Sequence, residues 1–162
     1  AQEIAKRDEL TGLYRRWFFS RCVENDLKSF AAGNRARESD PTSSVFVMLD
    51  LKGFALFNEL DEGQVAGDIA LQHAGEAMKR VLRSGDKLGR MGGDEFGLWL
   101  LGMNPARLAE KIDEINASLR KEDQRLAVHY GYEFFKPGMD FQDLYGGASV
   151  SLRKAKEASR KK

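Results

Sequence analysis

Two adjacent acids follow two glycines in the segment RMGGDEF, which runs from Arg90 to Phe96. Apolar runs on either side predict a β-hairpin whose tip carries Asp94 and Glu95. Neighbouring carboxylates repel each other, so a tip of this kind favours a positive charge beside it. A basic side chain or a metal ion could supply this charge, or only water could surround the two carboxylates. The segment itself does not decide among these three possibilities.

A third acid, Asp50, ends the apolar run SVFVMLDL, which predicts a short buried strand. If this strand lies beside the hairpin, the carboxylates of Asp50, Asp94 and Glu95 converge at one edge of a sheet. Mg²⁺ binds through one or two carboxylates together with waters and substrate phosphates. Gly92 and Gly93 lack side chains, so the turn can approach a phosphate or a sugar closely. The sequence therefore predicts a metal–phosphate site, with a merely polar hairpin tip as the alternative.

Helices and strands alternate in the segments that must position these acids. Apolar residues at helical spacing mark four helices, and apolar or alternating runs mark four strands. The order predicts one α/β domain in which helices cover a mostly antiparallel sheet, with an exposed loop at 31–44. Helices are expected at 16–30, 67–83, 105–119 and 141–158, and strands at 44–50, 87–91, 96–101 and 125–132.

Composition excludes several classes of protein. The 162 residues carry a formal net charge of +1, which argues against a nucleic-acid surface over the whole domain. No apolar run approaches the ~20 residues of a membrane span, and no signal peptide is recognisable. Cys22 is the single cysteine, which excludes an internal disulfide and a zinc site made of cysteines. Because the chain does not begin with methionine, we expect a single domain, 1–162, taken from a longer protein.

The segment from Gly92 to Phe96 resembles the signature of the GGDEF domain, the diguanylate cyclase family. Four further segments resemble motifs of that family in the same order: RDELTGLYRRWFF, LDLKGFALFNE, AGDIAL and SLRKAKEASR. The resemblance extends over nearly the whole chain. It implies an α/β sandwich with a mostly antiparallel five-stranded sheet flanked by helices, similar to the palm domains of nucleotide cyclases and polymerases.

The resemblance also implies a reaction, in which two GTP molecules are joined into cyclic di-GMP and two pyrophosphates are released. Each subunit would hold one GTP, so a homodimer is expected for catalysis. Asp50 and Asp94 would hold Mg²⁺, or Mn²⁺ in its place, with the Leu51 carbonyl as a further ligand. Glu95 would assist the metal or activate the attacking hydroxyl.

Further positions that match the family motifs are implied to contact GTP. Asn58 and Asp68 would recognise guanine, because an amide and a carboxylate suit its acceptors and N–H donors. Lys156 and Arg160 lie on one face of the last helix and would reach the triphosphate. Each has a structural alternative. Asn58 is then a turn residue, Asp68 caps a helix, and Lys156 and Arg160 belong to a solvated basic helix end. The implied substrate contacts are Phe54, Asn58, Asp68, Gly92, Gly93, Lys156 and Arg160.

Arg83 and Asp86 precede the hairpin at the spacing of the family's inhibitory R-x-x-D site. The resemblance implies that the product, cyclic di-GMP, binds there and inhibits the enzyme. Arginine can form paired hydrogen bonds to a phosphate or a guanine edge, and aspartate accepts from guanine donors. The alternative is structural: an arginine at a helix end and an aspartate in a turn.

A few positions depart from the family pattern. Lys52 replaces a second acid, Ala55 replaces a phosphate-contacting lysine, and one residue is inserted between Asn58 and Asp68. His129 replaces a serine and is interpreted as structural. Two functions follow: an active cyclase, or a weak or inactive module that binds cyclic di-GMP or GTP. In either case we expect an upstream sensor domain, no nucleic-acid partner, and a cytoplasmic location, free or as part of a membrane-bound sensor.

Overall fold

A five-stranded sheet forms the centre of the protein, whose computed structural model describes residues 5–34, 39–59 and 65–161. The strands are β1 (Tyr14–Arg15), β2 (Val45–Leu51), β3 (Lys87–Arg90), β4 (Glu95–Leu100) and β5 (Val128–Phe134). They lie in the order β1-β3-β4-β2-β5. β1 pairs with β3 in parallel, and the other three pairings are antiparallel. The expected mostly antiparallel five-stranded sheet is therefore confirmed.

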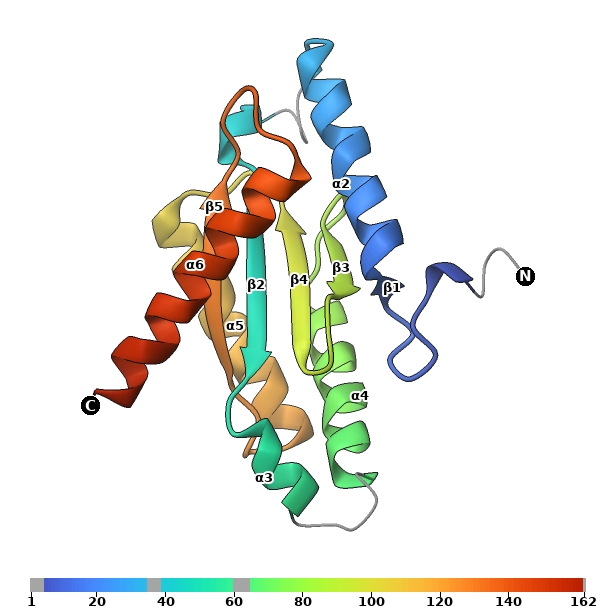
Figure 1. Ribbon diagram of the computed structural model, residues 1–162, viewed down its shortest axis with the longest axis vertical. Coiled ribbons are helices and arrows are strands. Elements are labelled where there is room, and N and C mark those ends of the chain that lie inside the picture. The colour runs from blue at the N-terminus through green and yellow to red at the C-terminus, as the bar shows by residue number, and fades with distance from the viewer. Residues whose placement is uncertain (1–4, 35–38, 60–64, 162) are drawn as a thin grey trace.

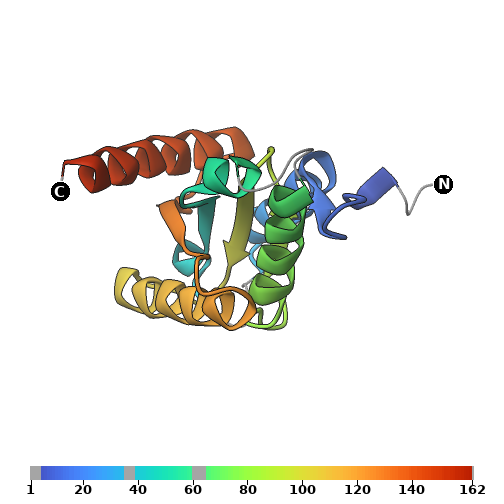
Figure 2. The ribbon, with the colours of Figure 1, turned by 90° about the horizontal axis from the view of Figure 1, so that it is seen from below.

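Helices cover both faces of the sheet (Figures 1 and 2). One face packs against α4 (Val65–Lys79) and α5 (Pro105–Glu122), and the other against α2 (Arg16–Ala31) and α6 (Phe141–Arg160). The short helix α3 (Phe54–Glu59) follows the end of β2. Within the described ranges, every helix is too short or too polar to cross a bilayer.

Strand β2 is buried along its whole length and contains Asp50 as its last residue but one. Successive side chains of a strand point to opposite faces. Val47 and Leu49 accordingly pack with α4 and α5, whereas Phe46 and Met48 pack with α2 and α6. The alternation places Asp50 on the face of the sheet that α6 covers.

Strand β5 begins later than its alternating pattern predicts. The pattern predicts 125–132, and the strand spans Val128–Phe134. A turn precedes it, in which the Leu126 N–H donates to the Asp123 carbonyl at 3.0 Å. Leu126 is nevertheless buried in the same core cluster as Val128, so the predicted inward face is correct although the predicted start is not.

Other predicted bounds also require correction. The second helix spans Val65–Lys79 rather than 67–83. The segment expected as a loop contains a short 3₁₀ helix, Pro41–Ser43, whose first turn is capped by the Asp40 carboxylate. Strand β1 was not among the strands predicted from residue patterns, because a two-residue element has no periodicity to detect.

Helix α6 lies close against β5 because Gly131 has no side chain. A Cβ built on Gly131 would lie 2.0 Å from the backbone nitrogen of Leu152 and 2.5 Å from the carbonyl oxygen of Ala148, both in α6. Backbone atoms cannot move aside as the end of a flexible side chain can. The distance between α6 and the sheet therefore depends on glycine at this position.

We expect Gly131→Ala to lower the free energy of unfolding by about 3 kcal/mol or more, the upper end of the usual cost of overpacking. The added methyl group must push α6 away from β5. Urea unfolding followed by circular dichroism measures the change. Gly146→Ala in α6 is the matched control, because a Cβ there meets nothing within 4 Å and alanine favours a helix. Wild-type stability of Gly131→Ala would contradict this packing.

Candidate active site

Asp50 and Asp94 meet where β2 ends and the hairpin between β3 and β4 turns. Asp50 lies opposite Glu95 in the pairing of β2 with β4, and the Leu51 N–H donates to the Asp94 carbonyl at 3.4 Å. Burial first, and then the charge of Asp50 and a hydrogen bond with it, raise the pKa of Asp94. The fold thus brings the strand-end acid and the tip acid together, as the sequence predicts.

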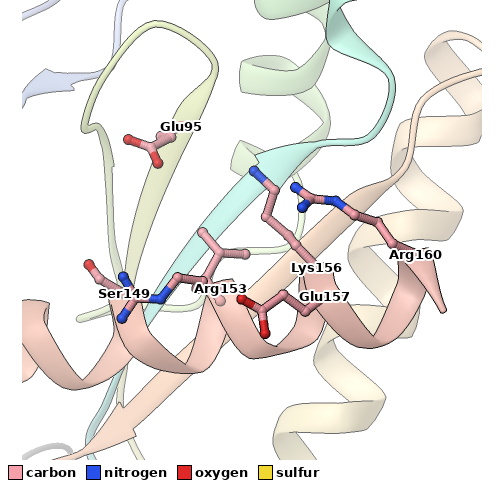
Figure 3. A pocket seen from close by; sticks show the side chains of 7 residues that line it. Glu95, Ser149, Arg153, Lys156, Glu157 and Arg160 are labelled. Atoms are coloured by element: carbon pink, nitrogen blue, oxygen red, sulfur yellow. The ribbon is translucent and has the colours of Figure 1, made fainter.

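Lys156 of α6 reaches the same point from the other side. Its Nζ donates a hydrogen bond to Asp50 Oδ2 at 2.5 Å, and the Asp50 side chain is only 7% exposed. Arg160 lies one turn further along α6. Figure 3 shows both side chains rising from α6, with the Lys156 ammonium directed toward the end of β2. The two implied triphosphate contacts therefore lie beside the two implied metal ligands.

These side chains share a cavity of about 390 Å³. Phe54, an implied substrate contact, lines it from the start of α3. Ala55 offers only a methyl group where the resemblance implies a lysine. The residues that line the cavity are Asp50, Leu51, Gly53, Phe54, Ala55, Asp94, His129, Lys156, Ser159 and Arg160.

Glu95 lines a second cavity, of about 320 Å³, which Figure 3 shows between the hairpin and α6. Lys156 and Arg160 line both cavities and form the boundary between them. The structure thus separates the two hairpin acids, Asp94 into the first cavity and Glu95 into the second. The residues that line the second cavity are Glu95, Ser149, Leu152, Arg153, Lys156, Glu157 and Arg160.

Arg90 fixes the tip of the hairpin. Its Nε and Nη2 donate to the Gly93 carbonyl at 3.3 and 2.8 Å, and its Nη1 donates to both carboxylate oxygens of Asp8 at 3.1 and 3.0 Å. Burial raises the pKa of Asp8, but hydrogen bonds from Thr11 and Arg90 outweigh it and lower the pKa below its ordinary value. Asp8 and Arg90 were not predicted as site residues, although they lie in the segments RDELTGL and RMGGDEF.

Gly92 and Gly93, at the tip of the hairpin, differ in how much space a side chain would find at each position. A Cβ on Gly92 would lie 3.0 Å from the Glu95 carboxylate, whereas one on Gly93 would meet nothing within 4 Å. Neither glycine has a positive φ. Neither internal packing nor backbone conformation therefore requires glycine at position 93, and the space beside it is free for a ligand.

Lys52 does not enter the cavity that contains Asp50. It is exposed and lines a separate cavity of about 330 Å³ with Phe57 and Arg125. His129, which lies opposite Asp50 in the pairing of β2 with β5, does line the Asp50 cavity. Burial first, and then the charge of Lys52, lower the pKa of His129 below 6.5, so its imidazole is mostly neutral at pH 7.

The structure treats the two implied guanine contacts differently. Asp68 is exposed in the first turn of α4, where the helix dipole favours a carboxylate. Because the chain is already helical from Val65, Asp68 is not the cap of this helix. Asn58 lies in α3, but its side chain lies outside the described part of the chain, as does 60–64, where the extra residue falls.

Arg83 and Asp86 bind each other and the backbone after β4. The Arg83 N–H and Nε donate to Asp86 Oδ2 at 3.0 and 3.3 Å, and the Leu101 N–H donates to Oδ1 at 3.2 Å. The Asp86 side chain is fully buried, whereas Arg83 is 28% exposed and lines a cavity of about 410 Å³. Arg83 Nη2 also donates to the Leu101 carbonyl at 2.5 Å. A ligand of Asp86 would have to displace two backbone donors, and a ligand of Arg83 would have to displace these contacts or use the remaining Nη1.

The donors at the Asp50 cavity suit a hard cation that is bound partly by water and substrate. Asp50 and Asp94 supply carboxylates, and Leu51 lines the same cavity. Within residues 5–34, 39–59 and 65–161, no three His, Cys, Asp or Glu side chains are grouped as a metal site. The residues therefore fit Mg²⁺ held together with phosphate oxygens, rather than a site made entirely of protein ligands.

Residues 5–162 match the family model described as "Diguanylate cyclase, GGDEF domain", and the chain belongs to the GGDEF family. Among curated relatives, Diguanylate cyclase DgcS of Shewanella oneidensis is 30% identical over 156 residues. That alignment covers 94% of this chain and 50% of the relative. The chain spans half or less of the length of the curated relatives that it matches.

Solved GGDEF structures share the fold. The diguanylate cyclase SiaD of Pseudomonas aeruginosa, solved in complex with its activator SiaC, is 28% identical with a TM-score of 0.79. The match covers 97% of this chain and 60% of SiaD. A microbial GGDEF domain solved with cyclic di-GMP is 26% identical with a TM-score of 0.78, covering 95% of this chain and 94% of that one.

We expect Asp94→Asn to raise the thermal unfolding midpoint at pH 7. The pKa of Asp94 is raised above 3.8 in the folded protein, so ionisation of Asp94 opposes folding, and this part of the stability is lost as the pH rises through the raised pKa. Scanning calorimetry at several pH values measures the effect, which should vanish in acid below the unfolded-state pKa. The exposed Asp113→Asn is the control. A lower midpoint for Asp94→Asn at pH 7 would contradict the raised pKa of Asp94.

Proposed function

We propose that this domain is a diguanylate cyclase that converts two GTP molecules into cyclic di-GMP and two pyrophosphates. The observation that carries the proposal is the Asp50 cavity, where two carboxylates face two cations of α6. Membership of the GGDEF family and similarity to DgcS support it. The substrate is a cytoplasmic nucleotide, which supports a cytoplasmic location.

Asp50 and Asp94, with the Leu51 carbonyl, would hold Mg²⁺ or Mn²⁺. Such an ion would neutralise phosphate charge and make a hydroxyl group easier to deprotonate. Two facing carboxylates in a partly buried cavity repel each other unless a positive charge lies between them. This repulsion supports a cation between Asp50 and Asp94.

The remaining side chains of the cavity would bind GTP. Lys156 and Arg160 would neutralise the triphosphate, since charge-assisted hydrogen bonds to phosphate are strong. Gly92 and Gly93 line a separate cavity with Asp8 and Arg90, so the nucleotide would have to extend over the hairpin tip to lie against its backbone. Phe54 would pack beside the substrate, and Asp68, exposed at the start of α4, would accept hydrogen bonds from guanine.

Catalysis would require a homodimer, because one cavity of about 390 Å³ serves one nucleotide. The 3′-hydroxyl of one GTP would attack the α-phosphorus of the other; the new O–P bond forms and the bond to pyrophosphate breaks. Glu95 would accept the hydroxyl proton, since it faces the adjoining cavity from which a second subunit can deliver its nucleotide. The complex of SiaD with an activator supports control of such a domain by an attached sensor or a partner.

A second function, nucleotide binding without catalysis, is favoured by two features of the cavity. Ala55 stands where the resemblance implies a lysine, and Lys156 is already paired with Asp50. Neither residue offers a free cation to a phosphate in this state. The domain would then bind GTP or cyclic di-GMP and signal without turnover. The GGDEF domain solved with cyclic di-GMP supports binding of that dinucleotide as a property of related domains.

We expect the domain to form cyclic di-GMP from GTP and Mg²⁺ at protein concentrations that favour dimers. Asp94→Ala should reduce the rate by about 1000-fold or more, because a metal site contributes several kcal/mol to the transition state. Chromatography of the products measures both. Asp113→Ala should retain full activity. If the wild-type domain binds nucleotide tightly but forms no product, the cyclase proposal is refuted and the domain functions as a nucleotide-binding module.

Product inhibition is expected to depend on Arg83. Arg83→Ala should weaken inhibition by added cyclic di-GMP about tenfold or more, since hydrogen bonds to charged groups contribute about 1.5–3 kcal/mol. Arg83→Lys should not restore inhibition, because lysine cannot form the paired hydrogen bonds. Inhibition constants measured with increasing product test this, and unchanged inhibition in Arg83→Ala would exclude the site.

A further inference from the structure

Lys156 forms an ion pair with Asp50, one of the two carboxylates that the proposed function assigns to a divalent cation. The Lys156 Nζ lies 2.5 Å from Asp50 Oδ2, and Asp50 is nearly buried. A buried carboxylate without a positive partner is costly, so this ion pair compensates the charge of Asp50 in the nucleotide-free domain. Lys156 is thus a substitute for the cation and not only a ligand of phosphate.

The ammonium and a divalent cation cannot share Asp50 without strong repulsion. A cation that is coordinated by Asp50 would lie within a few ångströms of the Lys156 Nζ, beside a carboxylate that is only 7% exposed, so water would screen the repulsion only in part. Asp94, which is hydrogen-bonded to Asp50, adds a second negative charge to the cavity. Entry of the cation therefore requires the ammonium to leave Asp50.

The Lys156 ammonium can adopt a second position, away from Asp50. Its side chain is 35% exposed, and it lines both the Asp50 cavity and the Glu95 cavity together with Arg160 (Figure 3). A flexible four-carbon stem can move the ammonium from Asp50 into the open space beside Arg160. A triphosphate in that space would offer new oxygen partners for the ammonium.

We propose that Lys156 couples the two ligands: in the free domain it blocks the cation site at Asp50, and a bound triphosphate draws it away and opens that site. The inference rests on the proposed function for the identity of the two ligands. Cation and triphosphate then bind cooperatively, and by thermodynamic reciprocity each raises the affinity of the other by the same factor. Removal of the ammonium should strengthen cation binding without nucleotide while it weakens nucleotide binding.

Direct titration with Mn²⁺ in the absence of nucleotide tests this coupling. We expect Lys156→Met to bind Mn²⁺ at least about tenfold more tightly than the wild-type domain, by calorimetry or by electron paramagnetic resonance of free Mn²⁺. Lys154→Met is the matched control, since it makes the same charge change at an exposed position of α6 that lines neither cavity. Lys156→Gln replaces Lys156→Met if the latter does not fold. Adding Asp50→Asn should abolish the gain.

The outcomes separate this inference from the proposed function. Unchanged or weaker Mn²⁺ binding in Lys156→Met and Lys156→Gln would overturn the coupling, as would an equal gain in Lys154→Met. Absence of Mn²⁺ binding in every variant would overturn it as well. The expected gain in a domain that makes no cyclic di-GMP would uphold the coupling and refute only the cyclase.

Discussion

Asp50 is a carboxylate that the alternation of a fully buried strand directs toward helix α6. Its side chain is 7% exposed, so its charge must be matched by a positive group within hydrogen-bonding distance. Helix α6 meets this requirement with Lys156. The hairpin adds a second acid, Asp94, and so increases the demand for positive charge. A divalent cation bound with a triphosphate would satisfy the same requirement more completely than one ammonium does.

The position of α6 links the stability of the domain to its chemistry. Gly131 permits the backbone of α6 to approach β5. The same helix carries Lys156 and Arg160, the two basic side chains that line both cavities. Arg90 has a comparable role at the opposite side of the site, because it ties the Gly93 carbonyl to the N-terminal Asp8. The acids, by contrast, are brought together against their own repulsion, as expected where a fold is arranged for a ligand.

Much of this arrangement could be predicted from the sequence. Strong apolar patterns predicted the central strand, the hairpin and the main helices, and short acids at a strand end and a turn predicted the meeting of Asp50 and Asp94. Spacing along the chain does not reveal side-chain partners, however. The contact of Lys156 with Asp50, the fastening of the hairpin by Arg90 and the internal bonding of Asp86 depend on tertiary packing between distant segments. Lys52, which replaces a second acid of the family pattern, lines a separate cavity, because spacing along the chain does not set the direction of its side chain.

In the nucleotide-bound domain, we expect a cation and a triphosphate together to replace the ammonium of Lys156 at Asp50. The most direct measurement is a crystal structure of the domain with Mn²⁺ and a non-hydrolysable GTP analogue, with anomalous scattering to locate the metal. We expect an anomalous peak between the carboxylates of Asp50 and Asp94, with Lys156 and Arg160 on phosphate oxygens. A bound nucleotide with no metal, and Lys156 still hydrogen-bonded to Asp50, would contradict it.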